Sequence, residues 1–74
     1  EYLTDDVENL DLNYPNLLIM AMKREDISLH LYTELSFRFA DEQIGTLFRK
    51  LASEEAKHKL WFETLYDEWL KQGN

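Results

Sequence analysis

The sequence contains no cysteine, one proline and two glycines among its 74 residues. Without cysteine there are no disulfide bridges and no thiolate metal ligands, so metal binding or association with another chain remain to support so small a fold. The same absence fits a reducing compartment, and we expect a cytoplasmic protein. No apolar run approaches the roughly 18 residues of a membrane span. Because the chain begins at Glu1 rather than Met, we expect it to belong to a longer protein.

Positive charge is also scarce. Eight Lys and Arg residues stand against 15 Asp and Glu residues, which gives a formal net charge of −7. Nucleic-acid binding depends on Lys and Arg that neutralise phosphates, so this balance argues against a nucleic-acid partner. An acidic surface instead attracts cations.

The chain divides into an acidic arm or crossover connection over residues 1–14 and a helical hairpin over residues 15–72. Pro15 suits the first turn of a helix and Gly73 suits a helix end, so we predict helices over about 15–39 and 42–71. Gly45 is expected to weaken the second helix by up to about 1 kcal/mol relative to Ala. The short connection makes the two helices antiparallel neighbours. The predicted fold class is all-α, an antiparallel two-helix hairpin.

Each predicted helix carries a heptad seam, with steps that alternate between three and four residues. The seam residues are Leu18, Met22, Glu25, Leu29, Tyr32, Ser36 and Phe39 in the first helix, and Ile44, Phe48, Leu51, Glu55, His58, Phe62, Leu65 and Trp69 in the second. Glu25, Glu55 and His58 therefore occupy core positions of mostly apolar stripes. Glu25 and Glu55 lie about 15 residues, or roughly 22 Å, on either side of a turn near residue 40, so the hairpin brings them to one level.

Two carboxylates and an imidazole that are buried together need a partner, and a metal ion is the simplest one. A Glu from one helix and a Glu-x-x-His from the next make up half of the di-iron or di-manganese carboxylate site of four-helix bundles. The complete site needs this set twice. The sequence therefore predicts that a second hairpin completes both the metal site and the bundle.

The stretches LLIMAMKREDISLHLYTELS and LFRKLASEEAKHKLWFETLYDEWL resemble the second half of the di-iron domain of rubrerythrin-like proteins, in the ferritin-like superfamily. The resemblance covers about residues 16–70. It rests on these features: Ala21 and Glu25, Tyr32 seven residues later, Leu47-Phe48, Leu51-Ala52, Glu55-x-x-His58 and Phe62-Glu63. It implies that the hairpin is half of a ferritin-like four-helix bundle.

By resemblance, Glu25 matches the ligand of the third bundle helix, Glu55 the bridging carboxylate and His58 the terminal nitrogen ligand of the fourth. Tyr32 matches a core tyrosine near the metals, where we expect a hydrogen bond to a ligand carboxylate. No catalytic residue is implied beyond the metal ligands. The sequence departs from rubrerythrins proper at Ser28, where they carry an additional glutamate, and it lacks the cysteines of their rubredoxin module.

The resemblance implies an iron cofactor, shared with a second hairpin as a di-iron centre, and oxidation of Fe(II) or reduction of peroxide. Manganese or zinc remain alternatives, since metal availability decides which ion fills such a site. The second hairpin would come from an identical chain, which makes a homodimer, or from a missing N-terminal half of the parent protein. A third option, an iron-storage subunit, would require a cage.

The non-metal interpretation is a helical dimerisation module in which Glu25, Glu55 and His58 form a buried polar network. We interpret Glu54 as a solvated flank of the seam and His30 as a surface residue. Lys57 and Lys59 have the pattern of ordinary solvated charges. Apolar residues beside the seams widen the apolar surface beyond what one hairpin covers, which favours a partner. These residues are Leu17, Ile27, Leu31, Leu35, Leu47, Leu60 and Trp61.

Overall fold

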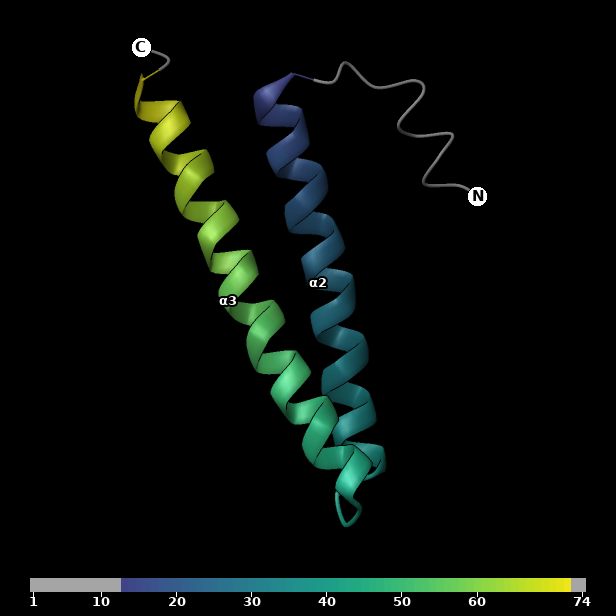
Figure 1. Ribbon diagram of the computed structural model, residues 1–74. Coiled ribbons are helices and arrows are strands. Elements are labelled where there is room, and N and C mark those ends of the chain that lie inside the picture. The colour runs from purple at the N-terminus through teal and green to yellow at the C-terminus, as the bar shows by residue number, and fades with distance from the viewer. Residues whose placement is uncertain (1–12, 73–74) are drawn as a thin grey trace, which may run out of the picture.

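A computed structural model describes residues 13–72, which form two α-helices and no strand in this part of the chain. Helix α2 spans Tyr14–Arg38 and helix α3 spans Gln43–Gln72. Each of the four helix ends lies one residue from its predicted position. The helices run antiparallel (Figure 1), so the predicted all-α hairpin is confirmed. Most of the predicted acidic arm, and the predicted stop at Gly73, lie outside the described residues.

The start of α2 follows from local chemistry. The Asn13 backbone is extended, and its side chain accepts a hydrogen bond of 3.0 Å from the Asn16 amide. This cap satisfies one of the amides that a helix N-terminus leaves without an intrahelical acceptor. Pro15 occupies the first turn, where its missing N–H costs nothing.

The connection between the helices is a tight turn closed by backbone hydrogen bonds. The Glu42 amide donates to the Phe39 carbonyl, and the Gly45 amide donates to the Glu42 carbonyl, each at 3.0 Å. Gly45 is buried against the end of α2. A Cβ atom added at this position would overlap the carbonyl oxygen of Phe39 and lie 2.7 Å from its carbonyl carbon. Glycine is therefore required here by the close approach of α3 to the backbone of Phe39, which the helix pattern alone does not indicate.

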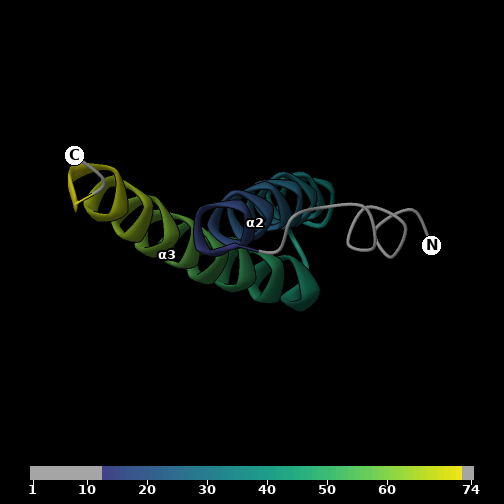
Figure 2. The same cartoon turned by 90° about the horizontal axis from the view of Figure 1, so that it is seen from above.

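The two helices form a single layer, and the molecule is only 11 Å thick along its shortest axis. They lie close together at the turn and diverge toward their other ends (Figures 1 and 2). Near the turn, the Phe48 ring contacts Tyr32 at 6.2 Å and Phe39 at 6.3 Å between ring centroids. Aromatic packing thus joins the helices between the turn and the middle of the hairpin.

The hairpin alone buries very little. Among residues 13–72, Leu18 is the one buried hydrophobic side chain, at 5% exposure. The predicted seam residues are half-buried or buried except for Ile44 and His58. Large apolar side chains outside the strict seam are exposed: Tyr14, Leu17, Ile27, Leu31, Phe37, Leu47, Leu60, Trp61 and Leu70. One layer of helices leaves an apolar face without cover, as the width of the apolar pattern predicts.

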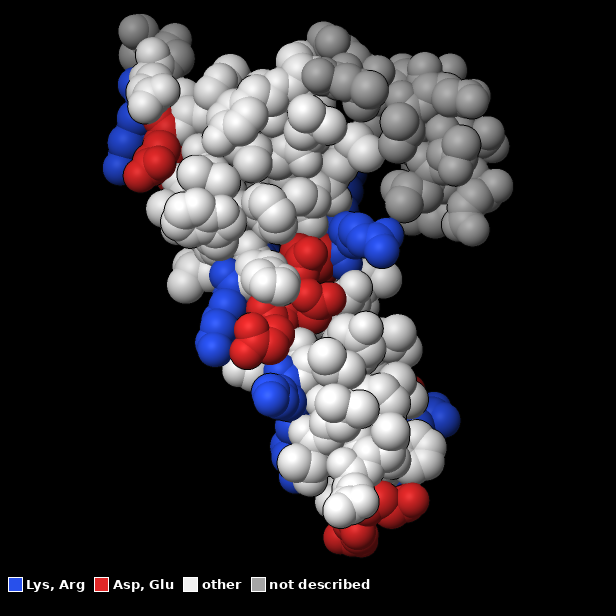
Figure 3. All heavy atoms as spheres, viewed as in Figure 1, with Lys and Arg blue, Asp and Glu red and all other residues white. Residues whose placement is uncertain are grey.

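On the face shown in Figure 3, acidic side chains gather at mid-length. The areas on either side of them consist mostly of residues other than Asp, Glu, Lys and Arg. Neither described helix contains a stretch long and apolar enough to cross a membrane.

Candidate metal centre

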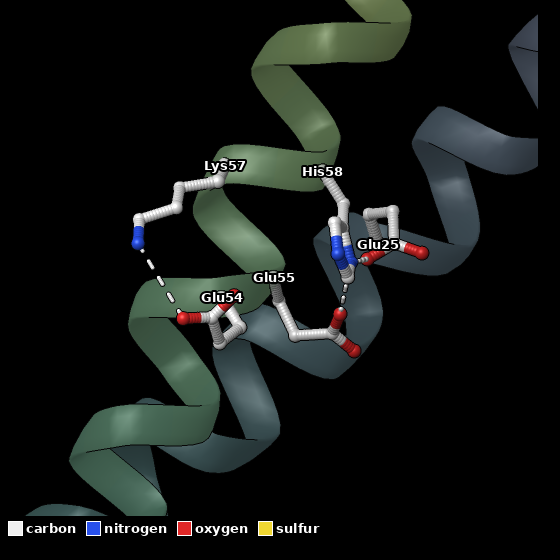
Figure 4. Close-up of polar contacts among 5 residues, drawn as sticks. All are labelled: Glu25, Glu54, Glu55, Lys57 and His58. Carbon is white, nitrogen blue, oxygen red and sulfur yellow. Dashed lines mark hydrogen bonds and ion pairs between the residues drawn. The ribbon is translucent and has the colours of Figure 1, made fainter.

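Glu25 of α2 and Glu55 and His58 of α3 point toward one another near the middle of the hairpin (Figure 4). One potential ligand atom from each residue lies within 4.8 Å of those of the other two. The convergence has a simple origin. Glu25 and Glu55 are nearly equidistant from the turn, and His58 lies one helical turn beyond Glu55 on the same face.

The three side chains differ in exposure. Glu25 and Glu55 are 16% and 19% exposed, whereas His58 is 57% exposed. The His58 Nδ1 atom lies 3.1 Å from Oε1 of Glu55, within hydrogen-bond distance, and 3.5 Å from Oε1 of Glu25. The carboxylates thus form the inner part of the group, and His58 stands at its outer edge, on the uncovered face. The predicted seam position of His58 is less buried than its heptad place suggests.

One atom of the group fits a cation especially well. Oε1 of Glu25 is buried, and no hydrogen-bond partner for it is found among the described residues. A buried carboxylate oxygen without a partner costs free energy, and a cation supplies the missing interaction. Two carboxylates and one imidazole are also a donor set that iron, manganese and zinc accept.

The pKa shifts of Glu25 and Glu55 also favour a cation at this group. Burial raises the pKa of Glu25, and the adjacent Glu55 carboxyl raises it further, against the opposing effect of His58. Hydrogen bonding from Glu25 holds the pKa of Glu55 below its ordinary range, with help from His58 and from the Ser28 side chain. Burial and the neighbouring carboxyl therefore disfavour the charged form of Glu25. Two carboxyls this close do not readily ionise together unless positive charge is placed between them.

A sequence model of the Rubrerythrin family matches residues 16–74, which is most of the chain. The chain belongs to the rubrerythrin family. Membership supports a ferritin-like helical domain of the iron-binding kind. No curated protein and no solved structure gives a significant match. The assignment of Glu25, Glu55 and His58 as metal ligands stays a prediction for this rubrerythrin-family protein.

The other residues singled out in the sequence lie around this group. Tyr32 packs its ring on Phe48, and its hydrogen bond to a ligand carboxylate stays a prediction. Glu54 points away from the group and pairs with Lys57 at 3.4 Å (Figure 4). His30 is exposed, and its Nδ1 lies 2.8 Å from the Asp26 carbonyl oxygen of the preceding turn. Glu54 and His30 thus contact residues of their own helices.

Two residues near the group were not assigned a role from the sequence. Lys59, interpreted as a solvated charge, is half-buried, and its ammonium donates a 2.7 Å hydrogen bond to Asp26 of α2. The Ser28 side chain contributes to the low pKa of Glu55, at the position where rubrerythrins proper carry a further glutamate. Their positions in the sequence could have indicated these two residues, because each lies within three positions of a predicted ligand.

The contact between Lys59 and Asp26 predicts a pH dependence of stability. The hydrogen bond from Lys59 lowers the pKa of Asp26, and the same bond raises the pKa of Lys59. A lowered acid pKa gives stability that is lost as pH falls below about 4, and a raised Lys pKa gives stability that is lost as pH rises above about 10. Asp26 also faces His30 at 3.7 Å, and Glu63 adds to the raised pKa of Lys59. Lys59→Met should therefore lower the unfolding midpoint between these limits and by less outside them.

Thermal unfolding of wild type and Lys59→Met across pH, in buffer with a chelator, measures this difference. Lys57→Met is the matched control, because the exposed pair of Lys57 with Glu54 is expected to contribute little at any pH. An equal gap between wild type and Lys59→Met at pH 3 and pH 7 would contradict the assignment.

Proposed function

We propose that Glu25, Glu55 and His58 bind iron as one half of a di-iron carboxylate centre, and that a second hairpin supplies the other half. The convergence of their ligand atoms within 4.8 Å carries the proposal. The buried Oε1 atom of Glu25 supports it, because among the described residues this atom has no hydrogen bond and only the longer contact with His58 at 3.5 Å.

The second hairpin would cover the exposed side of the ligand group, where His58 is 57% exposed. Exposed apolar side chains on both helices, such as Leu17, Leu31, Leu47 and Trp61, would gain by burial. The partner is therefore a helical hairpin that offers the same ligand types, either a second copy of this chain or the other half of a longer parent protein.

In this arrangement Glu25, Glu55 and His58 would hold the iron from this side, and the same residue types of the second hairpin would hold it from the other. Bound iron would supply electron exchange with dioxygen or peroxide, so the proposed reaction is oxidation of Fe(II) or reduction of peroxide. Both carboxyls would bind the cation in their deprotonated forms, because ligands must be deprotonated. Manganese or zinc would suit the same donors and make the site structural. A cytoplasmic location stays part of the proposal.

Metal content and native mass test the proposal together. Wild type loaded with Fe(II) without oxygen should hold about one iron per chain, since each ligand set supplies half of a two-metal site. Glu55→Ala should lose this iron. Glu54→Ala is the matched control, because Glu54 precedes Glu55 but points toward Lys57 instead of the group. Full iron retention by Glu55→Ala would refute the assignment.

A metal-free polar network is the second candidate, favoured by the 3.1 Å contact between His58 and Glu55. It predicts a stable dimer that takes up no Fe(II) and changes little with Glu55→Ala. If iron is bound, the consumption of peroxide or dioxygen per Fe(II) oxidised separates a redox centre from a structural one. Zinc retained with no oxidant consumption would favour the structural role.

A further inference from the structure

The bond between Lys59 and Asp26 is a hydrogen bond between the two helices beside the ligands. It joins residues 33 apart in the sequence and therefore links α3 to α2, as the longer contact of His58 with Glu25 at 3.5 Å does. The neighbouring side-chain hydrogen bonds of His30, Lys57 and His58 join residues only three or four apart, within one helix. At 2.7 Å, the Lys59 bond is also a close contact of the charge-assisted kind.

The bond lies directly beside the proposed ligands. Asp26 follows Glu25 in α2, and Lys59 follows His58 in α3. Each step along a helix turns by about 100°, so both residues are displaced to one side of the ligands. In antiparallel helices the two displacements fall on the same side of the interface. The side chains are 42% and 32% exposed, so solvent screens them only in part.

The bond adds to the other contacts between the helices. Near the turn the helices are joined by the rings of Phe48, Tyr32 and Phe39. Toward their other ends they diverge (Figure 1). Glu25 and Glu55 stand on opposite helices at this level, so the separation of the helices sets how closely their ligand atoms approach. The bond between Lys59 and Asp26 fixes this separation at the same height.

We infer that Asp26 and Lys59 are a positioning pair that sets the distance between α2 and α3 at Glu25, Glu55 and His58, and with it the affinity and geometry of the metal site. Neither residue acts as a ligand in this scheme. Asp26 also holds the Lys59 ammonium in an ion pair, so that this cation does not compete for the ligand carboxylates. The inference rests on the proposed function, since it concerns the same site.

Co(II) is a suitable probe, because its visible absorption reports the geometry of its ligands. The whole protein, stripped of metal and titrated with Co(II), should bind about tenfold or more weakly as Lys59→Met than as wild type, in the range found when groups that orient metal ligands are removed. At saturation, the absorption spectrum of the variant should differ from that of wild type. Helix content by circular dichroism should remain the same.

Two further variants sharpen the test. Lys59→Arg should keep the wild-type affinity and spectrum, because a guanidinium also donates to Asp26. Lys57→Met removes a lysine of the same helix that pairs only with Glu54, and it should behave as wild type.

Wild-type affinity and spectrum in Lys59→Met would overturn the inference. So would a weaker affinity that follows a loss of helix content, with an unchanged spectrum and no recovery in Lys59→Arg, because that pattern describes a general structural contact. If wild type itself binds neither Co(II) nor Fe(II), the proposed function fails, and the positioning role fails with it.

Discussion

Removal of metal by a chelator is expected to lower the thermal unfolding midpoint of the wild-type protein by roughly 10 °C or more. Metal held at a hundredfold excess over its dissociation constant stabilises a fold by about 2.7 kcal/mol, and 1 kcal/mol shifts the midpoint of a domain of this size by about 4–8 °C. The effect should be large because Leu18 is the one buried hydrophobic side chain among residues 13–72. The free energy of metal binding would then also stabilise the fold and the association of the hairpins.

Calorimetry and native mass spectrometry, with and without chelator, measure the two parts of this expectation. If the partner is another copy of this chain, the chelator should also reduce the fraction of protein that is dimeric. Glu55→Ala should start from the low midpoint and show no further change. An equal midpoint for metal-loaded and chelated wild type would mean that the fold does not depend on the metal.

Gly45→Ala is expected to destabilise the protein by about 2 kcal/mol or more, because an overpacked site costs typically 1–3 kcal/mol and here the clash is with backbone. The added Cβ would overlap the Phe39 carbonyl oxygen and lie 3.3 Å from the Ala40 nitrogen. These atoms belong to the turn, which moves only if one of the helices shifts. An ordinary helical glycine gives the opposite result, a gain of about 0.5–1 kcal/mol on replacement by Ala.

Denaturant unfolding of the chelated protein gives this change in the free energy of unfolding without a contribution from metal. Ser53→Ala is the control, since Ser53 is an exposed residue of the same helix and surface changes usually fall within about 0.5 kcal/mol. A stabilised Gly45→Ala variant would mean that the turn can open at no cost.

The hairpin and the meeting of Glu25 with Glu55 could be predicted from the sequence, because both depend on counting. Helix rise is constant, so equal separations from a short turn bring residues to the same level. The seams named the residues that lie between the helices, with Ile44 and His58 as exceptions. His58 is exposed because the described hairpin is a single layer, and a heptad pattern cannot state which layer covers which seam position.

The roles of Lys59 and Gly45 could not be predicted in the same way. A lysine next to a seam has the pattern of a surface charge, and only the crossing of the helices places its long side chain beside Asp26. Gly45 is interpreted from propensity as a weak point, whereas its actual environment is the carbonyl of Phe39. Both depend on how one helix approaches the other, which a pattern along one helix does not contain.

The two helices are joined at one end by the turn at Gly45, so a change in angle at the turn displaces the parts of the helices that lie far from it. The proposed ligands lie about 22 Å along the helices, so a change of about 5° in the crossing angle would move Glu25 and Glu55 relative to each other by about 2 Å. That displacement is as long as a bond from iron to a ligand oxygen. Small adjustments at the turn, far from any ligand, would therefore be amplified into the opening or closing of the metal site.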